Sequence, residues 1–333
     1  MYMKKIVIHL GLPKTASTTL QHHLFQKLYE QGKINFLGKV LSVDDKTGQI
    51  HTTNNSGKVI RDICEGKLER SAINTLDKIL SDTLLNVYSD EGLMACYPGL
   101  DNRSLEEKLT TLKSILAPYE VKILISLRNP VDYFYSLYVQ FYGQYYLGNK
   151  DYDTFDSYIR TYEKDRHNKL YESFHYADLL SKLGLLFETQ VILFEDLKHD
   201  KNHYYETVAK TLSLPTAEIS KLLESKHENK KQHIENSIIA VSNKSLALRL
   251  SKFEKRLRTN KVIFKIIQFM YHSKLIPVKY LLNKKITTTT KLDKLTNEQK
   301  TKLADFLLLS ATFDAEYYGL EREKLIRYSY ITP

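Results

Sequence analysis

The sequence predicts an α/β fold in which a parallel sheet is flanked by helices and followed by a helical C-terminal region. Strand-like apolar runs alternate with helix-like runs through the first half of the chain, as in sheets whose parallel strands are joined by crossover helices. From about Tyr204 to the end the pattern is helical. The chain has 333 residues, enough to bury a large core. We therefore predict an α/β core at 1–240 and a basic helical extension packed on it at 241–333.

The first strand and the first helix are marked by a short apolar run and then by leucine spacing. The run "KKIVIHL" (4–10) predicts a buried strand. Helical spacing of leucines from Leu20 to Leu28 predicts a helix that stops at Gly32, because glycine commonly ends helices. Residues 41–62 are polar and rich in turn residues, so we interpret them as an excursion or lid.

The middle of the chain continues the alternation. We predict a helix around 71–85 and a short strand in "GLMACY" (92–97). The next helix begins at Ser104, which forms a capping-box pattern with Glu107 three residues later. It leads into "EVKILISL" (120–127), the strongest strand signal in the chain.

A tyrosine-rich helix follows, with Pro130 in its first turn, where proline is well placed. A further buried strand is predicted in "QVILF" (190–194), and "TTTT" (287–290) is interpreted as a loop between helices. Four tyrosines at helical spacing are typical of a core stripe, with a sugar-binding cleft as the alternative: Tyr135, Tyr138, Tyr142 and Tyr145.

Composition excludes several classes of protein. Cys64 and Cys96 are the only cysteines, too few for a disulfide framework and without metal-site spacing, which indicates a reducing, cytoplasmic setting. No run approaches the 18 uncharged apolar residues of a membrane-spanning helix. The apolar part of "MYMKKIVIHLGL" is short and has no small-residue cleavage site, so we interpret it as a strand and not as a signal peptide.

The net charge of +10 predicts polyanionic partners, and the excess is concentrated in one segment. Residues 244–285, here called the basic segment, contain twelve Lys or Arg and a single acid, Glu254. A solvated helix face usually mixes both signs, so this imbalance favours a surface for an acidic glycan or an anionic membrane. No recognition motif for nucleic acid accompanies the charge, and we expect no nucleic-acid partner.

The stretch "VIHLGLPKTASTTLQHHLF" places a loop between the first strand and the first helix. Backbone N–H groups at a helix N-terminus bind anions. Lys14 adds a positive charge, and hydroxyl donors follow at Thr15, Ser17, Thr18 and Thr19. The triphosphate loop G-x-x-x-x-G-K-[ST] is not matched, because Gly11 has no second glycine after it and Lys14 follows it by three residues. The loop therefore predicts a site for a smaller anionic group.

A second anion site is predicted in "ILISLRNPVDYFYSLYVQF". Arg128 ends the strand and Ser136 lies about two turns into the next helix, so their side chains can converge on one phosphate. Arginine offers a planar fork of donors, and serine reaches a remaining oxygen. The alternative is an arginine that caps an ordinary strand-to-helix junction.

These stretches resemble the sulfotransferases that use 3′-phosphoadenosine 5′-phosphosulfate (PAPS), especially the bacterial carbohydrate sulfotransferases. "PKTASTT" is similar to their 5′-phosphosulfate loop P-K-[TS]-G-[TS]-[TS], and "RNPVDYFYSLY" to their 3′-phosphate element R-[ND]-P-x-[DE]-x-x-x-S-x-[YF]. "VILFEDLKHD" is similar to the family's YEDL turn, in which Glu195 and Asp196 would brace the site or cap a helix. A weaker likeness at "KKQHIENSIIAVSNKSL" puts Lys230 and Lys231 either near the 3′-phosphate or in a solvated loop.

The resemblance implies a P-loop-like fold that binds PAPS, passes its sulfuryl group to an acceptor hydroxyl or amine without a metal ion, and releases 3′-phosphoadenosine 5′-phosphate (PAP). Lys14 is implied as the catalytic lysine at the bridging oxygen, residues 15–19 as the 5′-phosphate site, and Arg128 with Ser136 as the 3′-phosphate site. Ala16 stands where the family has glycine. If that position needs a positive φ, alanine costs about 1 kcal/mol. Either the loop adopts an ordinary conformation there or binding is weakened.

A general base is also needed, and here the sequence leaves a choice. His51 comes first because its ordinary pKa suits proton transfer near neutral pH, although a histidine in a polar loop is commonly just solvated. The other candidates are Asp44, Asp45, Glu30 and Asp101.

Three functions remain open at this point. The first is a cytoplasmic sulfotransferase acting on a carbohydrate acceptor (a capsular polysaccharide, lipopolysaccharide or glycolipid), with the basic segment at the inner membrane face. The second is a kinase of the same broad fold using ATP and magnesium, against which the missing glycine argues. The third is a non-catalytic module that binds nucleotide or polyanion. The oligomeric state is left open.

Overall fold

The computed structural model describes residues 3–43, 50–98, 103–224, 233–234, 237–245 and 285–331. The chain divides into two compact units. Unit 1 comprises Met1–Leu137, Tyr162–Lys230 and Thr296–Pro333, and unit 2 comprises Tyr138–Thr161 and Lys231–Leu295. We keep the division between 240 and 241 as a proposal, because residues 246–284 of the predicted extension lie outside the described residues.

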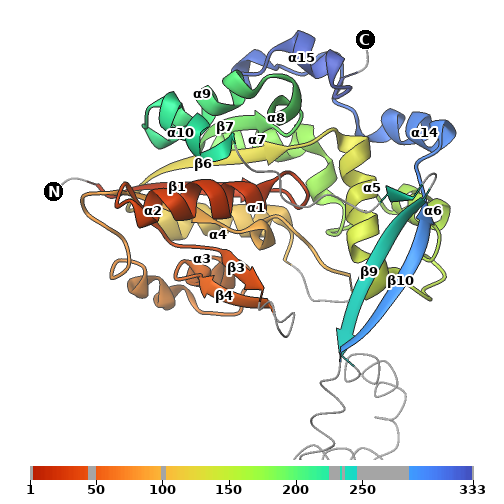
Figure 1. Ribbon diagram of the computed structural model, residues 1–333, viewed down its shortest axis with the longest axis horizontal. Helices are drawn as coiled ribbons and strands as arrows, with labels where there is room; N and C mark the ends of the chain where they lie inside the picture. The colour runs from red at the N-terminus through yellow and green to blue at the C-terminus, as the bar shows by residue number, and fades with distance from the viewer. Residues whose placement is uncertain are drawn as a thin grey trace, which may run out of the picture. The chain divides into compact units, whose positions relative to one another are not determined.

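Unit 1 is built on a five-stranded parallel sheet with the strand order β2-β5-β1-β6-β7 (Figure 1). Its strands are β1 (Lys5–Gly11), β2 (Ile34–Phe36), β5 (Leu85–Ser89), β6 (Glu120–Leu127) and β7 (Glu188–Leu193). The chain leaves the central β1 toward β2 on one side and later enters β6 on the other. Ligands in such sheets bind outside the carboxyl ends of strands where the order reverses, so the end of β1 is the expected location of a site. The parallel sheet confirms the predicted α/β class.

Helices cover this sheet and connect its strands (Figure 1). The elements of unit 1 before α5 are α1 (Ser17–Thr19), η1 (Leu20–Phe25), α2 (Gln26–Glu30), α3 (Lys58–Cys64), η2 (Arg70–Thr75), η3 (Glu91–Leu93) and α4 (Leu105–Leu116). Two helices cross the boundary between the units, α5 (Pro130–Phe141) and α6 (Phe155–Lys164). The later elements are η5 (Glu172–Phe174), α7 (Tyr176–Leu186), α8 (Asp196–His199), α9 (Lys201–Leu212), α10 (Thr216–Leu223), α14 (Asn297–Leu307), η6 (Glu316–Tyr318) and α15 (Arg322–Arg327).

One face of the sheet is buried by the first helical run together with α9 and α10. Val7 and Leu124 from neighbouring strands join a buried cluster with Leu24, Val208 and Ile219 from those helices. Burying apolar side chains at about 25 cal/mol per Å² is the main favourable term that holds such layers together. This packing fixes the start of the first helix against β1, and with it the loop between them.

Elements with strong local signals form where they were predicted. The capping box at Ser104 and Glu107 is present, with both hydrogen bonds made. β6 spans the predicted residues, α5 begins at Pro130, and the first helical run extends from Ser17 to Glu30 with Gly32 at φ 69° after it. The middle of that run, η1, is a π-helix.

Two predictions in the region 71–97 were wrong, while the excursion predicted at 41–62 stays a prediction. The excursion at 41–62 contains part of a hairpin, β3 (Val40–Val43) with β4 (Ile50–Asn54), and the start of α3. Residues 71–85 form a short 3-10 helix and turns where we expected one helix. The strand is β5, whose residues end before "GLMACY" begins, because pairing with β1 and β2 selects Leu85–Ser89.

Unit 2 departs from the predicted helical pattern after Tyr204. It contains η4 (Tyr142–Tyr146) and an antiparallel sheet of β8 (His233–Ile234), β9 (Ser237–Ser245) and β10 (Lys285–Asp293). The predicted loop 287–290 lies in β10, where Thr289 pairs with Val241. Threonine is β-branched, and a run of such residues fits a pleated strand better than a turn.

Candidate active site

The loop after β1 is tied together by its own side chains. The Thr15 hydroxyl donates a hydrogen bond to the Leu12 carbonyl at 2.6 Å, and the Ser17 hydroxyl approaches the same oxygen at 3.4 Å. Thr15 and Ser17 are buried, whereas Lys14 is exposed and Thr18 and Thr19 are half-buried. The two buried hydroxyls therefore shape the loop from within. The amides that begin a helix remain the groups suited to an anion there.

The backbone of this loop adopts two unusual conformations. Lys14 has φ 69° and Ala16 has φ 65°, both in the left-handed region. Of the two possibilities left open for Ala16, the loop adopts the glycine-like conformation with alanine in place, which costs about 1 kcal/mol or more. Gly11 is required on a different ground, since a Cβ atom there would lie 2.0 Å from the Ser17 Oγ.

The Lys14 ammonium group interacts electrostatically with charged groups that follow the two neighbouring strands. Withdrawal of water by the surrounding protein lowers the pKa of Lys14, Glu91 raises it, and Arg128 lowers it again. Lys14 follows β1, Glu91 follows β5 and Arg128 follows β6, and these three strands are neighbours in the sheet. The three side chains are therefore gathered at one edge by the parallel topology.

Arg128 joins the two predicted anion sites. Its Nη1 donates to the Lys14 carbonyl oxygen at 3.3 Å and to the Ser136 Oγ at 3.4 Å. Its guanidinium lies over the Phe194 ring, 5.0 Å from the centroid, and its Nη2 is 4.0 Å from Asp132. Its buried Nε has no hydrogen-bond partner among the described residues. An arginine with a donor left over beside a buried serine fits an oxyanion ligand.

The backbone that carries Arg128 is braced by the turn after β7. The Asn129 N–H donates to the Glu195 Oε1 at 2.9 Å, and the Tyr176 hydroxyl donates to the Arg128 carbonyl at 2.8 Å. Burial raises the pKa of Glu195, and its hydrogen bonds oppose that shift. Glu195 thus supports the backbone next to Arg128, and its role in a nucleotide site stays a prediction.

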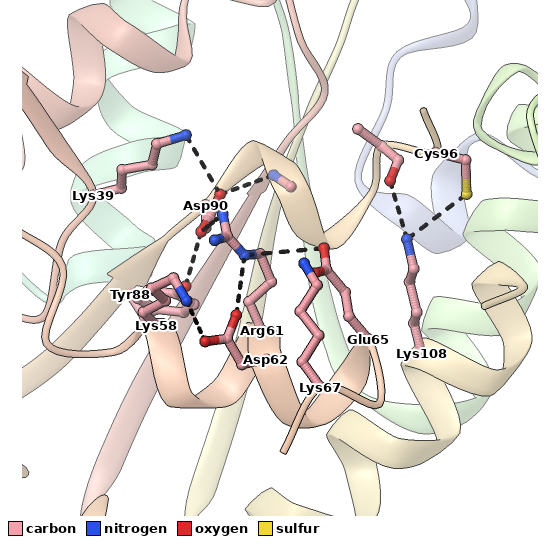
Figure 2. Close-up of polar contacts among 12 residues, drawn as sticks. Lys39, Lys58, Arg61, Asp62, Glu65, Lys67, Tyr88, Asp90, Cys96 and Lys108 are labelled. Atoms are coloured by element: carbon pink, nitrogen blue, oxygen red, sulfur yellow. Dashed lines mark hydrogen bonds and ion pairs between the residues drawn. The ribbon is translucent and has the colours of Figure 1, made fainter. Parts of the chain in front are cut away.

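Two carboxylates that the sequence reasoning missed lie just after β5. Asp90 is fully buried and accepts hydrogen bonds from Arg61 at 2.8 Å and Tyr88 at 3.0 Å, and Lys39 approaches it at 3.9 Å (Figure 2). Asp90 also accepts from the Gly92 N–H and so caps the short helix η3, whose first residue is Glu91. These contacts hold Glu91 at the sheet edge. The sequence prediction missed this pair because it put the strand at 92–97. Asp90 and Glu91 directly follow the strand only when the strand ends at Ser89.

Glu91 has the electrostatic setting of a proton acceptor. Burial and the neighbouring Asp90 raise the pKa of Glu91, while Lys39 and Lys14 lower it. A carboxylate whose pKa is raised toward neutrality accepts a proton more effectively than an ordinary one.

Of the general bases predicted from the sequence, the structure describes all of Glu30 and only the backbone of His51. His51 lies on β4 opposite Ser42 on β3, and its side chain is outside the described part of the structure. Glu30 ends α2 and accepts hydrogen bonds from Gln26 and Lys27 at the surface. Five other residues named in the sequence analysis lie outside the described residues: Asp44, Asp45, Asp101, Lys230 and Lys231.

A buried histidine supports the floor of the first loop. His9 on β1 is fully buried, with its Nδ1 2.7 Å from the Ser89 Oγ and its Nε2 2.9 Å from the Ser126 Oγ. Gln21 reaches the same Ser89 hydroxyl at 3.0 Å. Burial lowers the pKa of His9 to about 3, so the ring is neutral and links the ends of three strands.

The predicted tyrosine stripe lies in the core. Tyr135, Tyr138 and Tyr142 are all buried, and Tyr145 is half-buried. Within unit 2, Tyr138 packs on Tyr146 and Tyr158 at 5.5 and 5.1 Å between ring centroids. The core interpretation is therefore confirmed for the three buried tyrosines.

None of the helices in the described ranges is both long and apolar enough to cross a bilayer. Within the same ranges, no three His, Cys, Asp or Glu side chains gather as ligands for a metal ion.

The chain matches no protein-family model and no curated protein. Among solved structures it is similar to a sulfotransferase from Alicyclobacillus acidocaldarius, with 15% identity, a TM-score of 0.37, and 68% of this chain and 98% of that chain covered. It is also similar to the mouse sulfotransferase SULT7A1 complexed with PAP, with 13% identity, a TM-score of 0.31, and 69% and 70% covered. The sulfotransferase domain from the curacin biosynthetic pathway gives 14% identity, a TM-score of 0.37, and 68% and 80% covered. Likenesses at these levels carry no conclusion about activity.

Proposed function

We propose that the protein is a sulfotransferase that moves the sulfuryl group of PAPS to an acceptor hydroxyl or amine. The observation that carries this proposal is the position of Arg128, whose Nη1 bonds both the Lys14 carbonyl and the Ser136 hydroxyl. One arginine thus connects a loop suited to a 5′-phosphosulfate with a pair suited to a second phosphate. A nucleotide phosphorylated at both the 3′ and 5′ positions fits two such sites better than ATP does, since ATP carries its phosphates in one chain.

Each residue has a role in this reaction. Lys14 would neutralise the charge that grows on the oxygen bridging phosphorus and sulfur as the S–O bond breaks. The loop amides at 15–19 would hold the 5′-phosphate. Arg128 and Ser136 would hold the 3′-phosphate, with the free Nε–H of Arg128 as an additional donor. The acceptor oxygen or nitrogen forms the new bond to sulfur while the S–O bond to the 5′-phosphate breaks, and PAP leaves.

We assign the removal of the acceptor proton to Glu91. Its electrostatic coupling to Lys14 puts it beside the group implied in leaving-group stabilisation, and Asp90 holds its helix in place. Because the pKa of Glu91 is raised, it would both accept the proton in the transition state and release it to water afterwards. His51 remains the alternative predicted from the sequence.

For the acceptor we propose a carbohydrate, either a polysaccharide or the glycan of a glycolipid. Support comes from the likeness of the two phosphate motifs to bacterial carbohydrate sulfotransferases and from the basic segment, which carries twelve cations against one acid. Such a segment would attract an acidic glycan or an anionic membrane face on which a lipid-linked glycan is built. Binding to vesicles containing anionic lipid should weaken as salt concentration rises.

Calorimetry with defined nucleotides tests the proposal. PAP should bind at least about tenfold more tightly than adenosine 5′-phosphate. The latter lacks the ribose 3′-phosphate and therefore makes no charge-assisted bonds to Arg128. Equal affinities would overturn the assignment. Tighter binding of ATP with magnesium than of PAP would instead indicate the kinase. Preference for PAP without sulfuryl transfer from PAPS to any of a panel of glycosides, lipid-linked glycans and amines would indicate the non-catalytic module.

A further inference from the structure

The C-terminal end of unit 1 folds back toward the Arg128 site. After α15 the chain turns at Ser329 and ends in a short parallel pairing between Ile331 and Leu309, with the Leu309 N–H donating to the Tyr330 carbonyl at 2.8 Å. Tyr330 and Ile331 are buried. The blue α15 lies beside the green α9 in Figure 1, and Lys324 of α15 bonds Asp200 at 2.9 Å. The turn is therefore anchored on both sides.

This turn, Tyr328–Tyr330, makes a pair of bonds to the residue that follows Arg128. The Asn129 Nδ2 donates to the carbonyl oxygens of Tyr328 at 2.8 Å and Ser329 at 2.9 Å. Ser329 has φ 57°, a left-handed conformation that few residues other than glycine adopt readily. The Asn129 Oδ1 meanwhile accepts from the Asp132 N–H at 3.0 Å. One amide side chain thus connects the C-terminal turn to the first turn of α5.

A second connection passes through Glu195. The Tyr330 hydroxyl donates to the Glu195 Oε2 at 2.7 Å, and the other oxygen of that carboxylate accepts from the Asn129 N–H at 2.9 Å. Next to it, the Tyr328 hydroxyl donates to Asp196 at 3.0 Å. Hydrogen bonds to a charged acceptor are the stronger kind, and buried ones are costly to leave unmade. The carboxylate therefore transmits the position of the turn to the backbone beside Arg128.

We infer that the C-terminal turn Tyr328–Tyr330 positions Arg128 for the ribose 3′-phosphate, acting through Asn129 and Glu195. This inference rests on the proposed function. The turn does not contact the nucleotide; its residues are positioning residues. Arg128 has only 20% of its side chain exposed and must hold its fork toward a phosphate beside Ser136, so a small shift of its backbone would misalign the donors. Recognition of the 3′-phosphate then requires the turn Tyr328–Tyr330.

Tyr330→Phe tests this inference, because it removes one hydroxyl and keeps the buried ring. The measurement is the ratio of the dissociation constant of adenosine 5′-phosphate to that of PAP, by calorimetry at a fixed interval below each variant's melting temperature. We expect the ratio to fall about fivefold or more, as when one hydrogen bond to a charged group is lost. Adenosine 5′-phosphate affinity should stay unchanged. Tyr317→Phe, at a 66% exposed tyrosine in the same C-terminal stretch, is the matched control and should leave the ratio unchanged.

A double-mutant cycle shows whether the effect passes through Glu195. In a Glu195→Gln background, Tyr330→Phe should reduce the ratio much less than in the wild type, since the carboxylate it acts on is gone. An unchanged ratio in Tyr330→Phe, even with a lowered melting temperature, would overturn the inference and leave the turn a purely structural element. A wild-type protein with no preference for PAP would instead overturn the proposed function, so the two failures are distinguishable.

Discussion

The two corners of unit 1 that we propose as anion sites, the loop after β1 and the corner at Arg128, are built in opposite ways. The loop after β1 is local: Thr15 and Ser17 both contact the carbonyl of Leu12, and the strain at Lys14 and Ala16 lies within the same few residues. The corner at Arg128 is supported from distant parts of the chain, by Tyr176 and Glu195 and, through Asn129, by the C-terminal turn.

This difference separates two ways of damaging a binding site. A local corner keeps its shape when distant residues change, but it carries backbone strain that single substitutions can relieve or worsen. A corner supported from afar carries little strain of its own, and it depends on tertiary contacts that are complete only when the whole unit has folded. We therefore expect substitutions at the first corner to act on catalysis and backbone strain, and substitutions at the second to act on nucleotide selectivity.

The largest expected effect is at the first corner. Lys14→Met should reduce sulfuryl transfer from PAPS by about 10³-fold, because a preorganised charge at the leaving oxygen is lost. Lys14 is exposed, so the melting temperature should hardly change. Turnover of radiolabelled PAPS with a glycoside acceptor measures this, and a loss of less than fivefold would contradict the role.

Glu91→Gln should reduce turnover by about 10²-fold, as expected for removal of a general base. In the wild type, kcat/KM should fall as pH falls through the pKa of Glu91, which lies above the ordinary value of 4.5 because of burial and Asp90. The acid limb of the pH profile should disappear in Glu91→Gln. If His51→Asn removes that limb and Glu91→Gln does not, the base is His51.

At the second corner, Arg128→Lys should lower the preference for PAP over adenosine 5′-phosphate by about tenfold, because a point charge cannot reproduce the planar fork of donors. The affinity for adenosine 5′-phosphate itself should remain within about twofold. Equal losses for both nucleotides would mean that Arg128 acts on the fold of the site and not on one phosphate.

A smaller effect concerns the pH dependence of the free energy of unfolding, which His9 on β1 alters. His9 is neutral when folded, with a pKa of about 3 against an ordinary value of 6.5, so the unfolded chain takes up a proton first as pH falls. The contribution of neutral His9 to the free energy of unfolding is therefore complete above pH 6.5. Below pH 6.5 it decreases, and at pH 5 about 2 kcal/mol of it is lost. His9→Gln should remove that part of the pH dependence in urea unfolding. Parallel curves for the two proteins between pH 7 and pH 5 would contradict it.

The smallest expected effect is an increase in stability. Ala16→Gly should raise the free energy of unfolding by about 1 kcal/mol, because glycine adopts φ 65° without strain. Gly11→Ala is the opposing control and should destabilise, since its Cβ would meet Ser17 at 2.0 Å. A loss of stability in Ala16→Gly would show that the loop relaxes its conformation.

Much of the fold followed from signals spread over a few neighbouring residues. The capping box at Ser104, the apolar strand 120–127 and the helix that starts at Pro130 all formed as predicted. The order of charged and hydroxyl residues after β1 and β6 was also visible in the sequence. Such signals are reliable because capping bonds and apolar periodicity act within one or two turns of the chain.

The rest depends on pairing between segments far apart. β5 formed at Leu85–Ser89 because β1 and β2 pair with it there, and this brought Glu91 to the edge beside Lys14. The backbone at Arg128 and Asn129 is held by several elements along the chain: Tyr176 bonds the Arg128 carbonyl, and Asn129 bonds the turn at Ser329. No local pattern encodes a neighbour about 200 residues away. The residue types that could bind a nucleotide were therefore set by the chain's local chemistry, while their assembly into one corner was set by strand order and long-range packing.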